Sequence, residues 1–167
     1  TKAAYLIIED FGTTGLTGST DYNYESDGAF GHFWRAIGES GKAGGAGGRW
    51  GIGKRVLSDN SLLCCILGLT VRYDDERKLL MGQAILKHHE IDGTPYVPYG
   101  YFANIRDDGF QEPIDDQETL SSFENYFSLA RGLEPGLSIV VPEPDPEIDT
   151  DGLITATVLN YFYPILA

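Results

Sequence analysis

The chain has 167 residues, of which 42% are hydrophobic, and this predicts one globular domain over residues 1–167 with a sizeable core. It carries 25 acidic and 12 basic residues, a net charge of −13, so its field repels a polyphosphate backbone and direct contact with nucleic acid is not expected. No apolar stretch reaches the roughly 20 residues of a membrane span, and no secretory signal pattern opens the sequence, so no membrane contact is expected.

The two cysteines, Cys64 and Cys65, are neighbours within an apolar run. Adjacent cysteines form neither a disulfide framework nor a metal site with spaced ligands, so we expect both in the core and the protein in a reducing, cytoplasmic compartment. The chain opens on one apolar run and closes on another, without a helix stop or a polar tail. We therefore expect it to be a segment of a longer protein, truncated at both ends.

The first part of the chain predicts a strand, a long loop and two helices. Residues 3–8 are an apolar run followed by Glu9 and Asp10, the pattern of an interior strand that delivers an acidic residue to a loop. Residues 12–26 are rich in Gly, Thr, Ser and Tyr and predict that loop. Apolar residues at helical spacing predict helices at 27–37 and 54–67, on either side of a glycine-rich stretch.

The second part predicts strands and helices in alternation. Proline, glycine, tyrosine and aspartate without a sustained period predict an excursion from the core at 92–118, whose aromatic residues fix it to the sheet. Strands are expected at 69–73, 79–88 and 137–141, and helices at 119–131 and 153–162, the last with Asp149 or Thr150 as its cap. The element order predicts an α+β fold, a two-layer α/β sandwich whose mixed, mostly antiparallel sheet carries helices on one face.

The stretch GGAGGRWGIGKRV, residues 44–56, is rich in glycine, which gives its backbone more conformational freedom than other residues would. It is one residue short of the phosphate-binding pattern G-x-x-x-x-G-K-[ST], because Arg55 stands where the hydroxyl should be. A P-loop also needs an apolar strand directly before its first glycine, whereas GESGKAGGAG precedes Gly48. Three interpretations of this stretch remain open. It can be a phosphate-binding loop of another type, the loop of a P-loop nucleotide-binding protein, or a glycine linker in a non-enzymatic acidic interaction domain.

Two glycine motifs in this chain resemble those of one ATPase superfamily. The sequence D-F-G-T-T-G, which contains Asp10, Gly12 and Gly15, resembles the first glycine box, D-x-G-x-x-G, of the GHKL-type superfamily of gyrase, heat-shock chaperone, histidine kinase and MutL ATPases. Residues 48–54, G-R-W-G-I-G-K, resemble its second box, G-x-x-G-x-G, and the intervening residues 16–47 suit the superfamily's mobile lid. A late strand with Gly136 and Ser138 is a weaker match, and since strand neighbours face opposite sides, Ser138 is expected to point away from the ligand.

The resemblance implies a Bergerat fold that binds ATP. It implies that Asp10 accepts a hydrogen bond from the adenine amino group, and that Gly12 and Gly15 let the backbone approach the base and ribose. Phosphates would be held by backbone amides of the second box and by a lysine charge, which assigns these residues to cofactor binding: Gly48, Trp50, Gly51, Ile52, Gly53 and Lys54.

In this superfamily the magnesium-binding asparagine and the glutamate that activates water lie on a helix before the first box. The resemblance therefore places both outside this chain. We expect ATP and Mg²⁺ as cofactors, no catalytic or metal-binding residue among residues 1–167, and ATPase activity only in the intact protein. The expected partners are ATP and further domains of the same protein.

Overall fold

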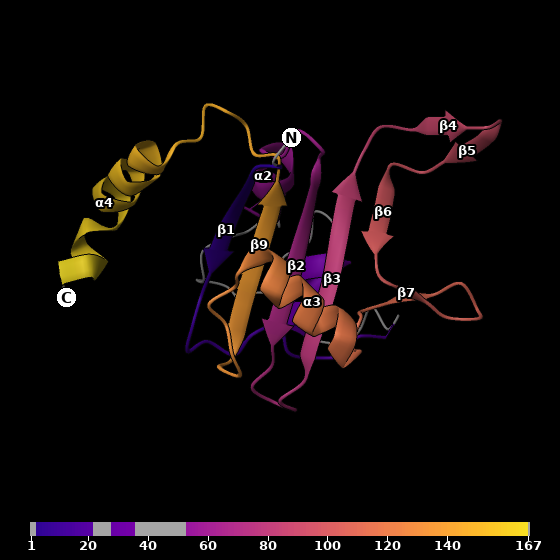
Figure 1. The fold of residues 1–167 in the computed structure, drawn as a ribbon, viewed down its shortest axis with the longest axis horizontal. Helices are drawn as coiled ribbons and strands as arrows, with labels where there is room; N and C mark the ends of the chain where they lie inside the picture. The colour runs from indigo at the N-terminus through magenta and orange to yellow at the C-terminus, as the bar shows by residue number, and fades with distance from the viewer. Residues whose placement is uncertain (1–2, 22–27, 36–52, 167) are drawn as a thin grey trace.

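The computed structural model describes residues 3–21, 28–35 and 53–166 (Figure 1). Its centre is a five-stranded sheet in the order β1-β9-β2-β3-β6, in which every neighbouring pair is antiparallel. The α+β class and the mostly antiparallel character of the sheet, both predicted from the sequence, are therefore confirmed, but the described sheet is not mixed. The strands are β1 (Tyr5–Glu9), β2 (Cys65–Val71), β3 (Lys78–Ile85), β6 (Tyr99–Phe102) and β9 (Gly136–Pro142).

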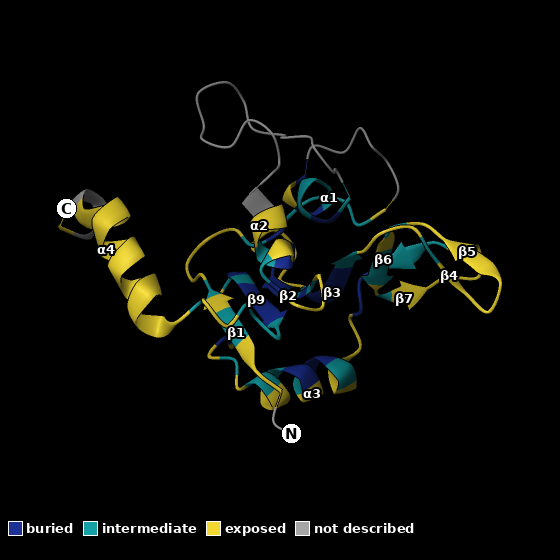
Figure 2. Ribbon diagram, turned by 90° about the horizontal axis from the view of Figure 1, so that it is seen from above, coloured by how far each residue is buried: buried dark blue, intermediate teal, exposed yellow. Residues whose placement is uncertain are grey.

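Helices cover both faces of this sheet, which corrects the prediction that they lie on one face. Figure 2 shows α1 and α2 on one side of the sheet and α3 on the other. The central strands require this arrangement, because successive residues point to opposite faces and both faces of β3 are apolar, with Met81 on one and Leu80 on the other. The described helices are α1 (Ala29–Trp34), α2 (Gly53–Asp59), α3 (Gln117–Phe127) and α4 (Thr150–Leu166).

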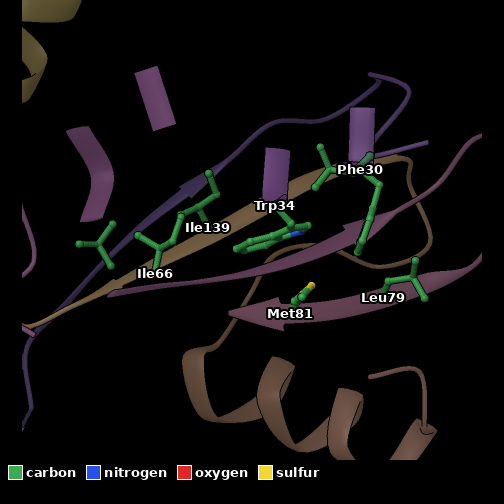
Figure 3. Packing of buried hydrophobic residues seen from close by; sticks show 8 residues of the cluster. Phe30, Trp34, Ile66, Leu79, Met81 and Ile139 are labelled. Atoms are coloured by element: carbon green, nitrogen blue, oxygen red, sulfur yellow. The ribbon is translucent and has the colours of Figure 1, made fainter. Parts of the chain in front are cut away.

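The face that carries α1 holds the core built around Trp34. Figure 3 shows Phe30 and Trp34 pointing from α1 onto the sheet, where both are fully buried. Trp34 lies flat over β2 because Gly68 has no side chain: a Cβ there would come within 2.8 Å of Trp34 Cζ2. The predicted lid, residues 16–47, thus contains a helix that belongs to the core, and its residues 22–27 and 36–47 lie outside the described part of the chain.

The opposite face is covered by α3. Leu120 and Phe123 of this helix are buried against β2, β3 and β9. The helix begins after Asp116, whose Oδ1 accepts a hydrogen bond from the Thr119 amide at 2.8 Å. That backbone hydrogen bond, together with one from the Thr119 side chain, holds the pKa of Asp116 below its usual range. Capping and an apolar stripe therefore fix α3 independently of the other face.

The helix predicted at 54–67 is wrong in its second half, because α2 ends at Asp59 and β2 begins at Cys65. Between them the Ser61 hydroxyl donates to the Pro142 carbonyl at 2.6 Å, and Cys64 takes a positive φ of 51°. These contacts turn the chain into the sheet after only seven helical residues. The same turn leaves Cys64 exposed and Cys65 half-buried, so the expectation that both cysteines lie in the core is wrong.

The excursion predicted at 92–118 is partly built into the sheet. It contributes the edge strand β6, and Ile114 is buried and exchanges backbone hydrogen bonds with Leu80. The Tyr101 hydroxyl donates to the Trp34 carbonyl at 3.0 Å and so fixes β6 to α1. Two short hairpins lie beyond this attachment: β4 (His89–Ile91) with β5 (Thr94–Tyr96), and β7 (Asn104–Ile105) with β8 (Gln111–Glu112).

Helix α4 stands clear of the sheet in both views (Figures 1 and 2). Asp149 Oδ1 accepts a hydrogen bond from the Gly152 amide at 2.6 Å, which confirms the predicted cap. Large apolar side chains along the helix are exposed, among them Leu159 and Phe162. Within residues 3–21, 28–35 and 53–166, no helix combines the length and apolar character needed to cross a bilayer.

Candidate functional site

The site is built at the end of β1, where Asp10 continues the pairing with β9 in an altered form. The Asp10 amide donates to the Leu137 carbonyl at 3.0 Å, as in a regular antiparallel pair. In such a pair the second hydrogen bond would run from the Leu137 amide to the Asp10 carbonyl. Here the Leu137 amide donates instead to the Asp10 carboxylate, at 2.7 Å from Oδ1. The side chain has taken the place of the backbone acceptor.

The two oxygens of the Asp10 carboxylate therefore have different environments. Oδ1 also accepts a hydrogen bond from the Thr13 hydroxyl at 3.0 Å, and Arg131 Nη2 lies 3.9 Å away. Oδ2 has no hydrogen-bond partner among the described residues, and the side chain is 52% exposed. One oxygen fixes the orientation of the carboxylate, and the other remains an acceptor that a ligand can reach.

The glycines of the first box allow the following loop to approach the sheet closely. Gly12 and Gly15 have positive φ values of 67° and 63°, in the left-handed region that favours glycine. A Cβ at Gly15 would overlap the Val71 carbonyl oxygen and come within 2.8 Å of Thr70 Oγ1. The structure thus brings the predicted residues Asp10, Gly12 and Gly15 together in one loop against the ends of β2 and β9.

Thr70 joins this loop to β9. Its hydroxyl accepts from the Leu16 amide and donates to the Gly136 carbonyl, both at 2.9 Å, and its side chain is buried. Gly136 in turn has a φ of +151°, and a Cβ there would lie 2.5 Å from the Asp10 carbonyl oxygen. Thr70 is not among the site residues predicted from the sequence. The signal that could have found it is a lone hydroxyl in the otherwise apolar strand CILGLTV.

The C-terminal end of this loop, at Gly18, is held by the buried side chain of Arg72. Arg72 Nη1 donates to the Gly18 carbonyl at 2.7 Å, and the guanidinium is paired with Asp74 at 2.8 Å. The hydrogen bond from Arg72 is the main reason why the pKa of Asp74 lies below its usual range. Residues 10–18 are therefore fixed at both ends, with the carboxylate of Asp10 at the first.

Ser138 points away from the Asp10 carboxylate, as expected from strand alternation. It is fully buried on the α3 side of the sheet, where its hydroxyl donates to Glu9 Oε1 at 2.7 Å and accepts from Arg131 Nε at 2.6 Å. The third motif of the resemblance thus provides no hydroxyl beside the Asp10 carboxylate. Its contribution to the site is structural, through the two charged side chains that it connects.

The second glycine box lies largely outside the described residues, which include neither Gly48, Trp50, Gly51 nor Ile52. Gly53 and Lys54 begin α2, so a helix does open at the last glycine of the box, as predicted. Arg55, at the hydroxyl position of a P-loop, is exposed and pairs with Asp59 one turn later at 3.3 Å. Within the described ranges, no group of three or more His, Cys, Asp or Glu side chains is arranged to hold a metal ion.

Comparison of the chain with protein-family models, with curated proteins and with solved structures finds no match in any of the three.

The hydrogen bonds of Thr70 yield a prediction about the stability of the site. Thr70→Val keeps the shape of the side chain but leaves the buried Leu16 amide without its acceptor and removes the side-chain donor to the Gly136 carbonyl. We expect it to lower the free energy of unfolding by about 2–4 kcal/mol, measured by urea denaturation. Thr70→Ser retains the hydroxyl and is the matched control, with a loss of less than about 1.5 kcal/mol from the missing methyl group. Equal losses in the two variants would show that the hydroxyl does not hold the loop.

Proposed function

We propose that this chain is the ATP-binding part of a GHKL-type ATPase, with Asp10 as the residue that recognises adenine. The observation that carries the proposal is the difference in hydrogen bonding between the two oxygens of the Asp10 carboxylate. Oδ1 is held by the Leu137 amide and the Thr13 hydroxyl, while Oδ2 accepts no hydrogen bond from the described residues and the side chain as a whole is 52% exposed. A preoriented acceptor of this kind suits the amino group of an adenine base.

The chemistry of the site favours adenine over guanine. The amino group of adenine would donate to Oδ2, whereas guanine presents a carbonyl oxygen at that position and would leave two acceptors facing each other. Polar groups left unpaired in this way discriminate strongly between ligands of similar shape. The left-handed glycines at 12 and 15 add to the fit, because at these two positions no side chain projects from the loop that follows Asp10.

The phosphates are assigned to the segment from Gly48 to Lys54. The support for this part of the proposal is the order of the two glycine boxes and the helix that opens at Gly53. ATP bound in this way would need Mg²⁺ to neutralise its phosphates. The resemblance places the magnesium ligand and the catalytic glutamate on a helix before the first glycine box, so for residues 1–167 we propose ATP binding and assign no residue to hydrolysis.

The Asp10→Asn variant tests the adenine assignment. Asparagine can keep the Oδ1 contacts to the Leu137 amide and the Thr13 hydroxyl, so the fold should survive. It replaces Oδ2 by an amino group that cannot accept a hydrogen bond from adenine, and we expect ATP binding to weaken by about 2 kcal/mol or more in the full-length protein. Isothermal calorimetry measures this difference. Asp107→Asn, at an exposed aspartate of the β7–β8 connection, is the matched control and should bind like the wild type.

Two further variants distinguish the proposal from its alternatives. If backbone amides of the second box hold phosphate, Gly53→Val should abolish ATP binding, because a branched side chain blocks the approach of the backbone. Arg55→Ser should leave binding nearly unchanged. A P-loop predicts that Arg55→Ser supplies a magnesium ligand and improves binding while Asp10→Asn is silent, and an interaction domain predicts no nucleotide binding in any variant. Tight ATP binding by Gly53→Val would exclude the phosphate cradle.

A further inference from the structure

Arg131 lies directly behind the Asp10 site, in the connection between α3 and β9. Its side chain has no exposed surface. The guanidinium donates to three acceptors in different parts of the chain: Nε to Ser138 Oγ at 2.6 Å, Nη1 to the Glu134 carbonyl at 3.0 Å, and Nη2 to the Asp10 carbonyl. It also lies over the ring of Phe11, 4.8 Å from the ring centre. These contacts fix both the position and the orientation of the buried guanidinium.

The contact with the Asp10 carbonyl explains the unusual pairing at the end of β1. In a regular pair this carbonyl would accept from the Leu137 amide. Because Arg131 Nη2 binds the carbonyl, the Leu137 amide is left for another acceptor, and it donates to Asp10 Oδ1. The direction of the carboxylate, and with it the exposure of Oδ2, is thus linked to the position of the guanidinium.

Glu9 and Ser138 hold that guanidinium from the side of the sheet that carries α3. Ser138 Oγ accepts from Arg131 Nε and donates to Glu9 Oε1, and Glu9 Oε2 accepts from the Ala130 amide at 3.0 Å. Burial lowers the pKa of Arg131, and the negative charges of Asp10, Glu9 and Glu134 oppose that shift. The cation is therefore compensated within the network, as a buried charge must be.

We propose that Arg131 is the positioning residue of Asp10, with Glu9 and Ser138 as the side chains that fix the guanidinium. Arginine is required because its planar group presents donors in several fixed directions, whereas the ammonium of lysine is a single point on a flexible stem. The consequence for ATP rests on the proposed function, while the geometry of Asp10 itself is a property of the protein without ligand. The two can be tested separately.

The first test uses the ligand-free, full-length protein. Arg131→Lys keeps the charge but cannot reach all three acceptors. We expect the Leu137 amide proton, followed by NMR, to exchange faster with solvent and to shift upfield as its hydrogen bond to Oδ1 weakens. Arg77→Lys is the matched control, because Arg77 is 45% exposed and pairs with Asp115 at the surface. An unchanged Leu137 amide in a folded Arg131→Lys protein would overturn the proposal.

Ser138→Ala provides a second, milder change for the case in which Arg131→Lys does not fold. It removes the Nε acceptor and leaves the other two contacts of Arg131 in place. The Leu137 amide should change in the same direction as in Arg131→Lys, by a smaller amount. Wild-type exchange and chemical shift at Leu137 in Ser138→Ala would overturn the proposal as well.

The second test measures ATP binding by calorimetry. Arg131→Lys should weaken ATP binding by about tenfold, the effect of losing one charge-assisted hydrogen bond that orients Asp10, and Arg77→Lys should bind normally. Wild-type ATP affinity in Arg131→Lys would contradict the positioning role. If the wild-type protein itself does not bind ATP, the proposed function fails, and the Leu137 amide still decides whether Arg131 positions Asp10.

Discussion

The hydrogen bond from the Leu137 amide to the carboxylate of Asp10 is the interaction on which the site depends. It ends the regular pairing of β1 with β9 and directs one carboxylate oxygen into the protein. Three features accommodate it: Gly136 leaves room beside Asp10, Thr70 binds the Gly136 carbonyl, and Arg131 occupies the Asp10 carbonyl. In the role proposed for Arg131, loss of its guanidinium would free the backbone carbonyl of Asp10 to accept from the Leu137 amide, and the carboxylate would lose its fixed direction.

The buried positive charges also lie next to the loop that contains Asp10. The chain is strongly acidic, yet among the described residues the two buried arginines, Arg72 and Arg131, both serve the loop after β1. Arg131 binds the carbonyl of Asp10 at its start and Arg72 binds the carbonyl of Gly18 at its end. Burying a guanidinium is costly unless it is paired and hydrogen-bonded. The conformation of this loop is therefore fixed at both ends by a buried guanidinium that binds a backbone carbonyl.

Much of the sheet could be predicted from the sequence because its strands are short apolar runs that end at turns. The layer arrangement was missed although the strands carry a signal for it: the continuous apolar runs of β2, β3 and β9 are typical of strands that are buried on both faces. The boundary between α2 and β2 was also missed. Apolar residues continue from one element into the other, and only tertiary contacts such as that of Ser61 with Pro142 show where the helix stops.

The candidate site was predictable in part. A carboxylate and two glycines directly after a strand indicate a ligand loop, and the structure places Asp10, Gly12 and Gly15 in one such loop. Thr70 and Arg131 were not predictable, because their roles depend on contacts across 54 and 121 positions of the chain. Ordinary propensities describe neighbours, whereas a buried polar side chain is chosen for partners that only the folded chain brings near.

The central claim is that the exposed oxygen of Asp10 recognises the amino group of adenine. The most direct test compares the affinity of the full-length protein for ATP with its affinity for purine riboside triphosphate, which lacks only that amino group. The account predicts that ATP binds at least about tenfold more tightly, because the analogue leaves a desolvated acceptor without a donor. Equal affinities for the two nucleotides would contradict it.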